Sequence, residues 1–122
     1  MARVALLCPD LLFGSRLEGA LGAAGHEVTR YDGDDAARAA ASEADVLVVD
    51  LTADGYDGAM LVESMRTGGE LGGVPALGFY AHVDVETRRR AQEAGFDLVV
   101  PRSRMAREAA ALVEGLADRR QS

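Results

Sequence analysis

The sequence predicts an α/β fold: a single doubly wound domain in which one parallel sheet carries helices on both faces. Two observations predict it. Short apolar runs alternate five times with segments of helical periodicity, which is the pattern of strand–helix–strand units joined by right-handed crossovers. The most apolar of these runs, VLVV at residues 46–49, is typical of a strand buried on both faces of a parallel sheet.

Five strands are predicted, and turn-forming or polar residues bound most of them. The first run stops at Pro9 and the third at Asp50, while Pro101 closes the fifth. The second run alternates between polar and apolar residues, so we expect it at an edge of the sheet. The fourth has Pro75 near its start, where a missing N–H is tolerated. The strands are expected at residues 4–8, 26–31, 46–49, 74–80 and 98–100.

Five helices are predicted from apolar or alanine-rich segments with helical spacing. Asp10 is placed to cap the first helix, and Gly25 and Gly95 follow the first and fourth helices as terminators. The helices are expected at residues 11–24, 34–42, 58–67, 85–94 and 103–119. The whole chain, residues 1–122, is therefore interpreted as one domain without an output domain, with residues 120–122 as a loose tail.

Composition excludes several classes of protein. The chain has 122 residues, of which 48% are apolar and 27% charged, and its net charge of −7 disfavours nucleic-acid binding. No apolar run approaches the roughly 18 residues that a membrane span needs. Cys8 is the lone cysteine, so no internal disulfide forms, and a reducing cytoplasm is the expected location. All thirteen basic residues are arginines, and the chain contains no lysine.

Asp50 is the first candidate for a functional residue. It stands at the carboxyl end of the most apolar strand, and ligands of open α/β sheets bind at such ends. A structural carboxylate that accepts N–H groups of the following loop is the alternative interpretation. Asp10, after the first strand, is likewise either a helix cap or a metal ligand.

Three short motifs carry a family resemblance. Asp50 is followed at the seventh and eighth positions by Asp57-Gly58, GHEV occupies residues 25–28, and AGFD occupies residues 94–97. With these motifs in this order, the chain resembles a response-regulator receiver domain over nearly its whole length. The resemblance implies a flavodoxin-like sheet with the strand order 2-1-3-4-5, and it makes Asp50 the phospho-acceptor position.

The other active-site positions of the family carry different residues here. A working receiver has an acidic pair after the first strand, a serine or threonine after the fourth and a lysine after the fifth. In this chain the acidic pair falls on Cys8 and Pro9, and the hydroxyl position falls on Tyr80. The lysine position falls on Pro101 or, with a shift of one residue, on Arg102. The resemblance therefore implies an atypical receiver, or pseudo-receiver, whose phosphorylation machinery is largely lost.

Two consequences are expected at the site. Clustered carboxylates hold Mg²⁺ in receivers, whereas here only Asp10, Asp50 and the carbonyl of Thr52 are left for a weak magnesium site, so we expect no resident metal and no other cofactor. Two positions are possible for Tyr80. Its ring either covers Asp50 and so mimics an occupied site, or it packs on the fourth helix.

A set of arginines suggests a partner surface. In receivers the fourth helix, fifth strand and fifth helix form the usual dimerisation and partner face. Cations at the start of the last helix oppose the helix dipole, which suggests that they serve another purpose. We expect this face to bind an acidic protein segment or a second copy of the chain; ordinary solvated surface is the alternative. The arginines are Arg88, Arg89, Arg90, Arg102, Arg104 and Arg107.

Three functions are compatible with these residues. The first is a non-enzymatic, stand-alone signalling module in the cytoplasm that acts through a protein partner. The second is a genuine phospho-accepting receiver that uses Asp50, with Arg102 in place of the lysine and Mg²⁺ as cofactor. The third is a small flavin or nucleotide enzyme, which CPDLL at residues 8–12 disfavours because it lacks the glycines and hydroxyls of a phosphate-binding loop.

Overall fold

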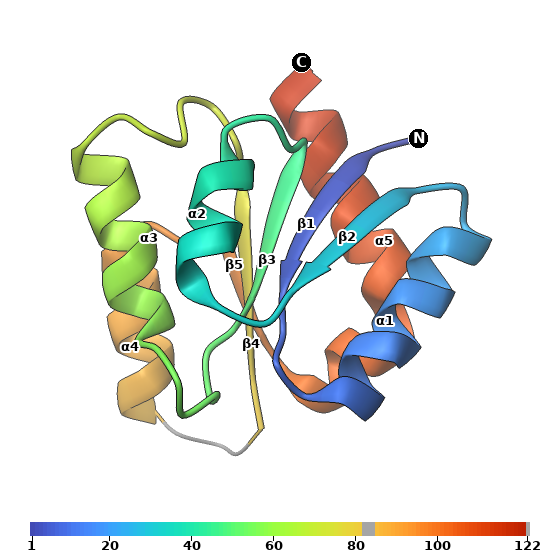
Figure 1. Ribbon diagram of the computed structural model, residues 1–122, viewed down its shortest axis with the longest axis horizontal. Helices are drawn as coiled ribbons and strands as arrows, with labels where there is room; N and C mark the ends of the chain where they lie inside the picture. Colours follow the sequence, from blue (N-terminus) through green and yellow to red (C-terminus); the bar gives the residue numbers. More distant parts are fainter. Residues whose placement is uncertain (82–84, 122) are drawn as a thin grey trace.

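Five parallel strands run through the centre of the molecule in the computed structural model, which describes residues 1–81 and 85–121 (Figure 1). Within those residues the sheet has the order β2-β1-β3-β4-β5, as the resemblance implied. The strands are β1 (Arg3–Leu7), β2 (Glu27–Tyr31), β3 (Val46–Asp50), β4 (Ala76–Tyr80) and β5 (Leu98–Pro101).

Helices cover both faces of this sheet (Figure 1). Two of them, α1 and α5, pack against one face, and the other three pack against the opposite face. The helices are α1 (Leu11–Ala23), α2 (Asp34–Ala41), α3 (Gly58–Thr67), α4 (Val85–Ala94) and α5 (Arg102–Gln121). The doubly wound α/β fold predicted from the sequence is therefore confirmed.

The strand β3 contributes to a separate apolar core on each face. Val46 and Val48 belong to the core under α1 and α5, whereas Leu47 and Val49 belong to the core under α2, α3 and α4. All four side chains are completely buried. Because successive strand residues point to opposite faces, a strand covered on both sides must be apolar throughout, which explains the VLVV run.

The carboxyl-terminal end of the chain differs from the sequence prediction. Residues 120–122 were expected as a loose tail, but α5 continues through Gln121, and Ser122 lies outside the described residues. Arg120 donates a hydrogen bond of 2.7 Å to the carbonyl oxygen of Ala44. This contact ties the last turn of the helix to the loop before β3. Within the described residues, no helix has both the length and the apolar character needed to cross a membrane.

Asp57 and Gly58 fix where α3 begins. The Asp57 carboxylate caps the helix by accepting a 3.0 Å hydrogen bond from the N–H of Met60. Gly58 lies so close to β3 that an added Cβ would be 2.8 Å from Cγ1 of Val49. A carboxylate cap followed by glycine therefore brings the start of α3 against the end of β3, beside Asp50.

Candidate functional site

A cavity of about 510 Å³ opens at the carboxyl edge of the sheet. It draws residues from the ends of β1, β3 and β4, from the loop after β2 and from the first residue of α5. Five of the positions singled out in the sequence meet here, although they are far apart along the chain. The lining residues are Pro9, Asp10, Asp32, Asp50, Thr52, Ala53, Asp54, Gly55, Ala81 and Arg102.

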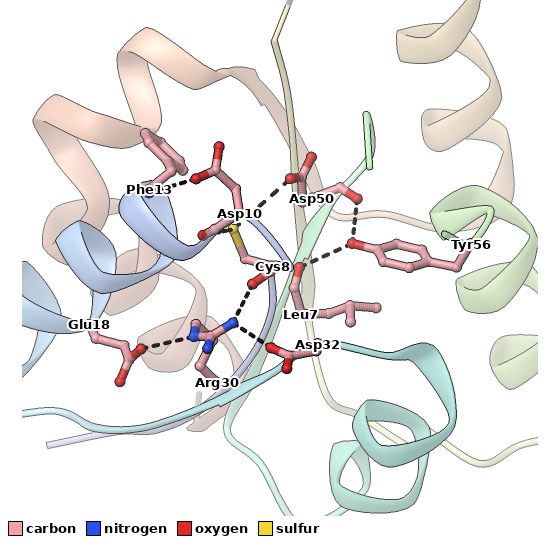
Figure 2. Close-up of polar contacts among 9 residues, drawn as sticks. All are labelled: Leu7, Cys8, Asp10, Phe13, Glu18, Arg30, Asp32, Asp50 and Tyr56. Carbon is pink, nitrogen blue, oxygen red and sulfur yellow. Dashed lines mark hydrogen bonds and ion pairs between the residues drawn. The ribbon is translucent and has the colours of Figure 1, made fainter. Parts of the chain in front are cut away.

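Asp50, the last residue of β3, lines this cavity and is only 4% exposed. Its Oδ1 accepts hydrogen bonds from the backbone N–H of Thr52 at 2.9 Å and from the Thr52 hydroxyl at 3.0 Å. Its Oδ2 accepts from the thiol of Cys8, with 4.0 Å between sulfur and oxygen (Figure 2). Asp50 thus binds the N–H of its own loop, as a structural carboxylate would, and all these donors are uncharged.

Cys8, which the resemblance aligns with one position of the acidic pair of receivers, is completely buried. Burial, together with the nearby charge of Asp50, raises the pKa of the Cys8 thiol to about 11. The group therefore remains a protonated thiol near neutral pH. It acts as a weak hydrogen-bond donor to Asp50 and cannot serve there as an anionic metal ligand.

Asp10 combines a capping role with an ion pair. Its Oδ1 accepts from the N–H of Phe13 at 3.0 Å and so caps α1 (Figure 2). Its Oδ2 accepts from Nη2 of Arg102 at 2.7 Å. The Phe13 N–H, followed by the Arg102 guanidinium, lowers the pKa of the Asp10 carboxyl below its usual range. Both oxygens of Asp10 are therefore engaged within the chain.

Arg102 is held on two sides. Besides its ion pair with Asp10, its guanidinium carbon lies 4.1 Å from the centroid of the Phe13 ring, which is a favourable cation–π arrangement. Arg102, rather than Pro101, lines the cavity, so it is the residue that places a cation at this edge. Pro101 instead pairs with Tyr80 as the last residue of β5.

Tyr80 is buried at the end of β4, with 7% of its surface exposed. Alternation along the strand places it on the face of Ala76 and Gly78, which is the face covered by α3 and α4. Ala81, and not Tyr80, is the lining residue at this strand end. The geometry of the described residues therefore gives no support to the expectation that the Tyr80 ring covers Asp50.

Tyr56 is a contributor that the sequence analysis missed. Its hydroxyl donates to the carbonyl oxygen of Asp50 at 2.8 Å and lies 3.3 Å from that of Leu7 (Figure 2). Burial, and then the charge of Asp50, raises the pKa of the phenol far above its usual range. Tyr56 thereby joins the ends of β1 and β3. An isolated tyrosine in a polar loop carries no sequence signal for this role.

Arg30 is a second missed contributor, reaching the site from β2. It donates to the carbonyl oxygen of Cys8 at 2.9 Å and pairs with Asp32 at 2.6 Å and Glu18 at 3.2 Å (Figure 2). An added Cβ on Gly14 would lie 2.6 Å from Cδ of Arg30. Glycine at this position of α1 gives the arginine room to reach the end of β1.

The arginines of the expected partner surface mostly have carboxylates of their own chain beside them. Arg89 pairs with Glu86 and Glu93, Arg90 pairs with Asp57, and both Arg104 and Arg107 approach Glu108 at 3.4 and 3.7 Å. Among the described residues, no ion pair is found for Arg88. The six arginines are therefore less available than the sequence suggested. Arg107, whose side chain is 66% exposed, and Arg88 are the candidates for contact with a partner.

The residues at the cavity do not fit a resident magnesium ion. Mg²⁺ prefers several carboxylate or carbonyl oxygens in octahedral geometry. Cys8 and Pro9 supply no carboxylate, and both oxygens of Asp10 already have partners. In the part of the chain that the structure describes, no three histidine, cysteine or acidic side chains are grouped as a metal site.

Comparison with solved structures shows the fold of receiver domains. The receiver domain of the Francisella response regulator 1452 superposes with a TM-score of 0.85 at 18% identity, over 98% of each chain. A CheY-like receiver-domain protein from Methanospirillum hungatei gives a TM-score of 0.85 at 15% identity, over 99% of this chain and 97% of that one. The Vibrio cholerae chemotaxis protein CheY4 gives 0.82 at 19% identity, over 95% and 98%. Neither the protein-family models nor the curated proteins give a match.

Proposed function

We propose that this chain, which has the receiver-domain fold, is a signalling module that acts by binding a protein partner without phosphorylation of Asp50. The observation that carries the proposal is the set of contacts around Asp50. Its two carboxylate oxygens accept hydrogen bonds from Thr52 and Cys8, and uncharged groups occupy the family's acidic positions beside it.

The chemistry of phosphoryl transfer supports this proposal. The transferring group carries negative charge over its oxygens, and catalysis depends on metal ions and cationic side chains that neutralise it. The cavity lining contains four aspartates and one arginine, and that arginine is bound to Asp10. The same acidic lining disfavours a nucleotide or flavin phosphate. The module is accordingly proposed to be non-enzymatic and to need no cofactor.

The partner surface is proposed on α4, β5 and α5. Arg88 and Arg107 present guanidinium groups there, and exposed pairs such as Arg104 with Glu108 contribute little stability and exchange partners readily. An acidic protein segment, or a second copy of the chain, would fit this face. We place the protein in the cytoplasm, where the free thiol of Cys8 stays reduced.

The alternative is a receiver that does accept a phosphoryl group on Asp50. Arg102 favours it, because its guanidinium lines the same cavity and guanidinium groups bind phosphate well. The replacement is not conservative, since the forked guanidinium is larger than an ammonium and is already engaged by Asp10.

Incubation with acetyl phosphate and Mg²⁺, followed by intact-mass spectrometry, tests the proposal. We expect no phosphoryl adduct on the wild-type chain under conditions in which a reactive receiver domain is fully modified. The Asp50→Asn variant is the matched control. An adduct that forms on the wild type and is absent from Asp50→Asn would establish the alternative.

A further inference from the structure

The exposed large apolar side chains gather at the edge of the sheet that carries the cavity. Among the described residues other than Met1, those that are mostly exposed are Leu11 at 64%, Leu12 at 84%, Met60 at 61% and Val85 at 75%. Each lies in the first three residues of α1, α3 or α4. These helices all begin at the carboxyl edge of the sheet, α1 on one face and α3 and α4 on the other (Figure 1).

Leu11 and Leu12 directly follow Pro9 and Asp10, which line the cavity. Met60 lies on the other face, at the start of the helix that follows the lining loop at residues 52–55. None of the three lines the cavity, but Leu11 and Leu12 adjoin its lining in the sequence, and all three lie at helix starts on the same edge of the sheet. Exposed apolar side chains close to polar groups mark a surface that can bind another protein.

The buried carboxylate in this cavity has no cationic partner among residues 1–81 and 85–121. Asp50 accepts hydrogen bonds only from neutral groups, and its Oδ2 has, within the described residues, only the Cys8 thiol at 4.0 Å. Arg102, the one lining cation, is bound to Asp10. Asp54, also on the cavity wall, has no ion pair among the described residues. Buried charges are normally compensated, and no described cation forms an ion pair with Asp50 or Asp54.

We infer that the cavity receives a lysine or arginine side chain of a partner protein, whose neighbouring apolar residues contact Leu11, Leu12 and Met60. The inserted cation would pair with Asp50 and Asp54 and supply the compensating positive charge that no described residue gives these two carboxylates. Apart from Arg102, which lines the cavity, this surface does not include the partner-surface arginines of α4 and α5. The inference rests on the proposed function in that Asp50 must be unphosphorylated.

A side-chain cation fits the residues better than a free metal ion. Among the described residues, Asp50 and Asp54 are the carboxylates on the cavity wall without an ion-pair partner, and two carboxylates make a weak site for Mg²⁺. A lysine ammonium or an arginine guanidinium group can be bound by two or three carboxylate oxygens. The apolar residues next to that lysine or arginine in the partner can at the same time contact Leu11 and Leu12.

Chemical-shift mapping of the ¹⁵N-labelled full chain tests this inference. The probe is the acetylated, amidated peptide Leu-Ser-Arg-Ser-Leu, and the matched control peptide has neutral citrulline in place of arginine. We expect the arginine peptide to shift amide signals of residues 10–12, 50–55 and 60, and the citrulline peptide to bind roughly tenfold or more weakly, because a hydrogen-bonded ion pair is lost. Equal binding of the two peptides, shifts confined to other surfaces, or no shift would overturn the inference.

Variants of the chain then locate the contact. Asp50→Asn and Asp54→Asn should each weaken the arginine peptide several-fold, and Leu12→Ser should weaken both peptides alike. Glu43→Gln removes an equal charge from the loop before β3, at the amino edge of the sheet, and should leave binding unchanged. Equal weakening by Glu43→Gln would show a general charge effect and overturn the inference.

Two further measurements separate the remaining explanations. Guanidinium chloride and MgCl₂ are each titrated into the labelled chain without peptide. If either salt reproduces the chemical-shift changes of the arginine peptide at the same concentration, the cavity is a site for free cations and the inference is overturned. The intact-mass measurement with acetyl phosphate is run on the same samples. Phosphorylation of Asp50 would refute the proposed function, whereas failure of the arginine peptide on an unphosphorylated chain would refute only this inference.

Discussion

Asp10 and Arg102 are joined across the cavity by a 2.7 Å hydrogen bond between Oδ2 and Nη2, although they are 92 positions apart in the chain. The bond connects the first residue of α5 with the cap of α1. The same guanidinium lies over the Phe13 ring, and the centroid of that ring is 5.3 Å from the centroid of the Phe79 ring in β4. The ion pair therefore couples the edge of the cavity to the apolar core between α1, α5 and the sheet.

The Asp10 pair makes stability depend on pH in the acid range. The pKa of Asp10 is lowered in the folded chain from its usual value of 3.8, so its contribution is complete above that value and is lost as the pH falls through the lower folded pKa. Asp10→Asn keeps a capping oxygen but loses the charge. We expect its urea-unfolding free energy to fall less steeply with acidification than that of the wild type.

The control for this comparison is Glu43→Gln, which removes one carboxylate from the opposite edge of the sheet. A residual acid dependence is expected in Asp10→Asn, because Arg90 lowers the pKa of Asp57 and Arg38 lowers that of Glu70. If Asp10→Asn and the wild type lose stability in parallel below about pH 4, the ion pair makes no contribution to folding.

Magnesium binding can be restored by design if Cys8 is the residue that prevents it. Calorimetric titration of the wild type should show no saturable binding at low millimolar Mg²⁺. Cys8→Asp places a second carboxylate beside Asp50, where the Cys8 sulfur now lies 4.0 Å from Oδ2. Without metal the variant should lose several kcal/mol of unfolding free energy through burial of a second carboxylate beside Asp50, and Mg²⁺ should restore part of this loss.

Cys8→Asn is the matched variant, with the same shape and no charge. Its stability should not respond to Mg²⁺. A saturable, sub-millimolar site that involves Asp50 in the wild type would contradict the account of the cavity given above.

Tyr80→Thr restores the family's small hydroxyl residue and separates the two interpretations of this tyrosine. Because Tyr80 is buried and does not line the cavity, the substitution should leave an unfilled space in the core and lower the unfolding free energy by about 2–4 kcal/mol. It should not increase modification by acetyl phosphate. Tyr80→Phe, which keeps the ring, should preserve most of the stability. An increase in phosphodonor reactivity in Tyr80→Thr would show that the ring does shield Asp50.

The arginines at the start of α5 can be tested by reversing their charge. In Arg104→Glu/Arg107→Glu, acidic residues improve the interaction with the helix dipole by about 0.3–1 kcal/mol each. In the wild type both arginines lie near Glu108, and the double variant loses these two attractions, which offsets the gain. The net change in unfolding free energy should therefore stay within about 0.5 kcal/mol. Self-association through this face should weaken.

Sedimentation at two salt concentrations, beside thermal melting, measures both effects. Arg16→Glu/Arg119→Glu reverses the same amount of charge on exposed positions of α1 and the end of α5, and should leave self-association unchanged. Association that is identical in the two double variants would identify Arg104 and Arg107 as ordinary solvated surface.

Most of the fold could be predicted because burial leaves a periodic pattern. The wholly apolar β3, and the helices at residues 58–67 and 85–94, are recognisable from local spacing alone, and Asp50 stands out because a carboxylate ends an apolar strand. The resemblance to receiver domains, and not local spacing, grouped Asp10, Thr52 and Arg102 with Asp50, and all three line the same cavity.

Other parts of the site depend on contacts that no local pattern encodes. Tyr56 reaches Leu7 across 49 positions, and Arg30 reaches Cys8 across 22. Long side chains such as arginine can choose among many partners, so pairs such as Arg66 with Asp97 or Arg90 with Asp57 follow only from the folded geometry. Likewise, the face of the sheet toward which the Tyr80 side chain points follows from the alternation along β4 in the folded chain.

The position of Tyr56 makes it an intrinsic optical reporter for this edge of the sheet. The chain has three tyrosines and no tryptophan, and the Tyr56 phenol is held between the carbonyl oxygens that end β1 and β3. In an alkaline spectrophotometric titration its absorbance change should trail that of free tyrosine, because burial and the nearby charge of Asp50 raise the pKa of the Tyr56 phenol. The lag between the two titrations therefore reports how well this edge of the sheet is buried, without any added label.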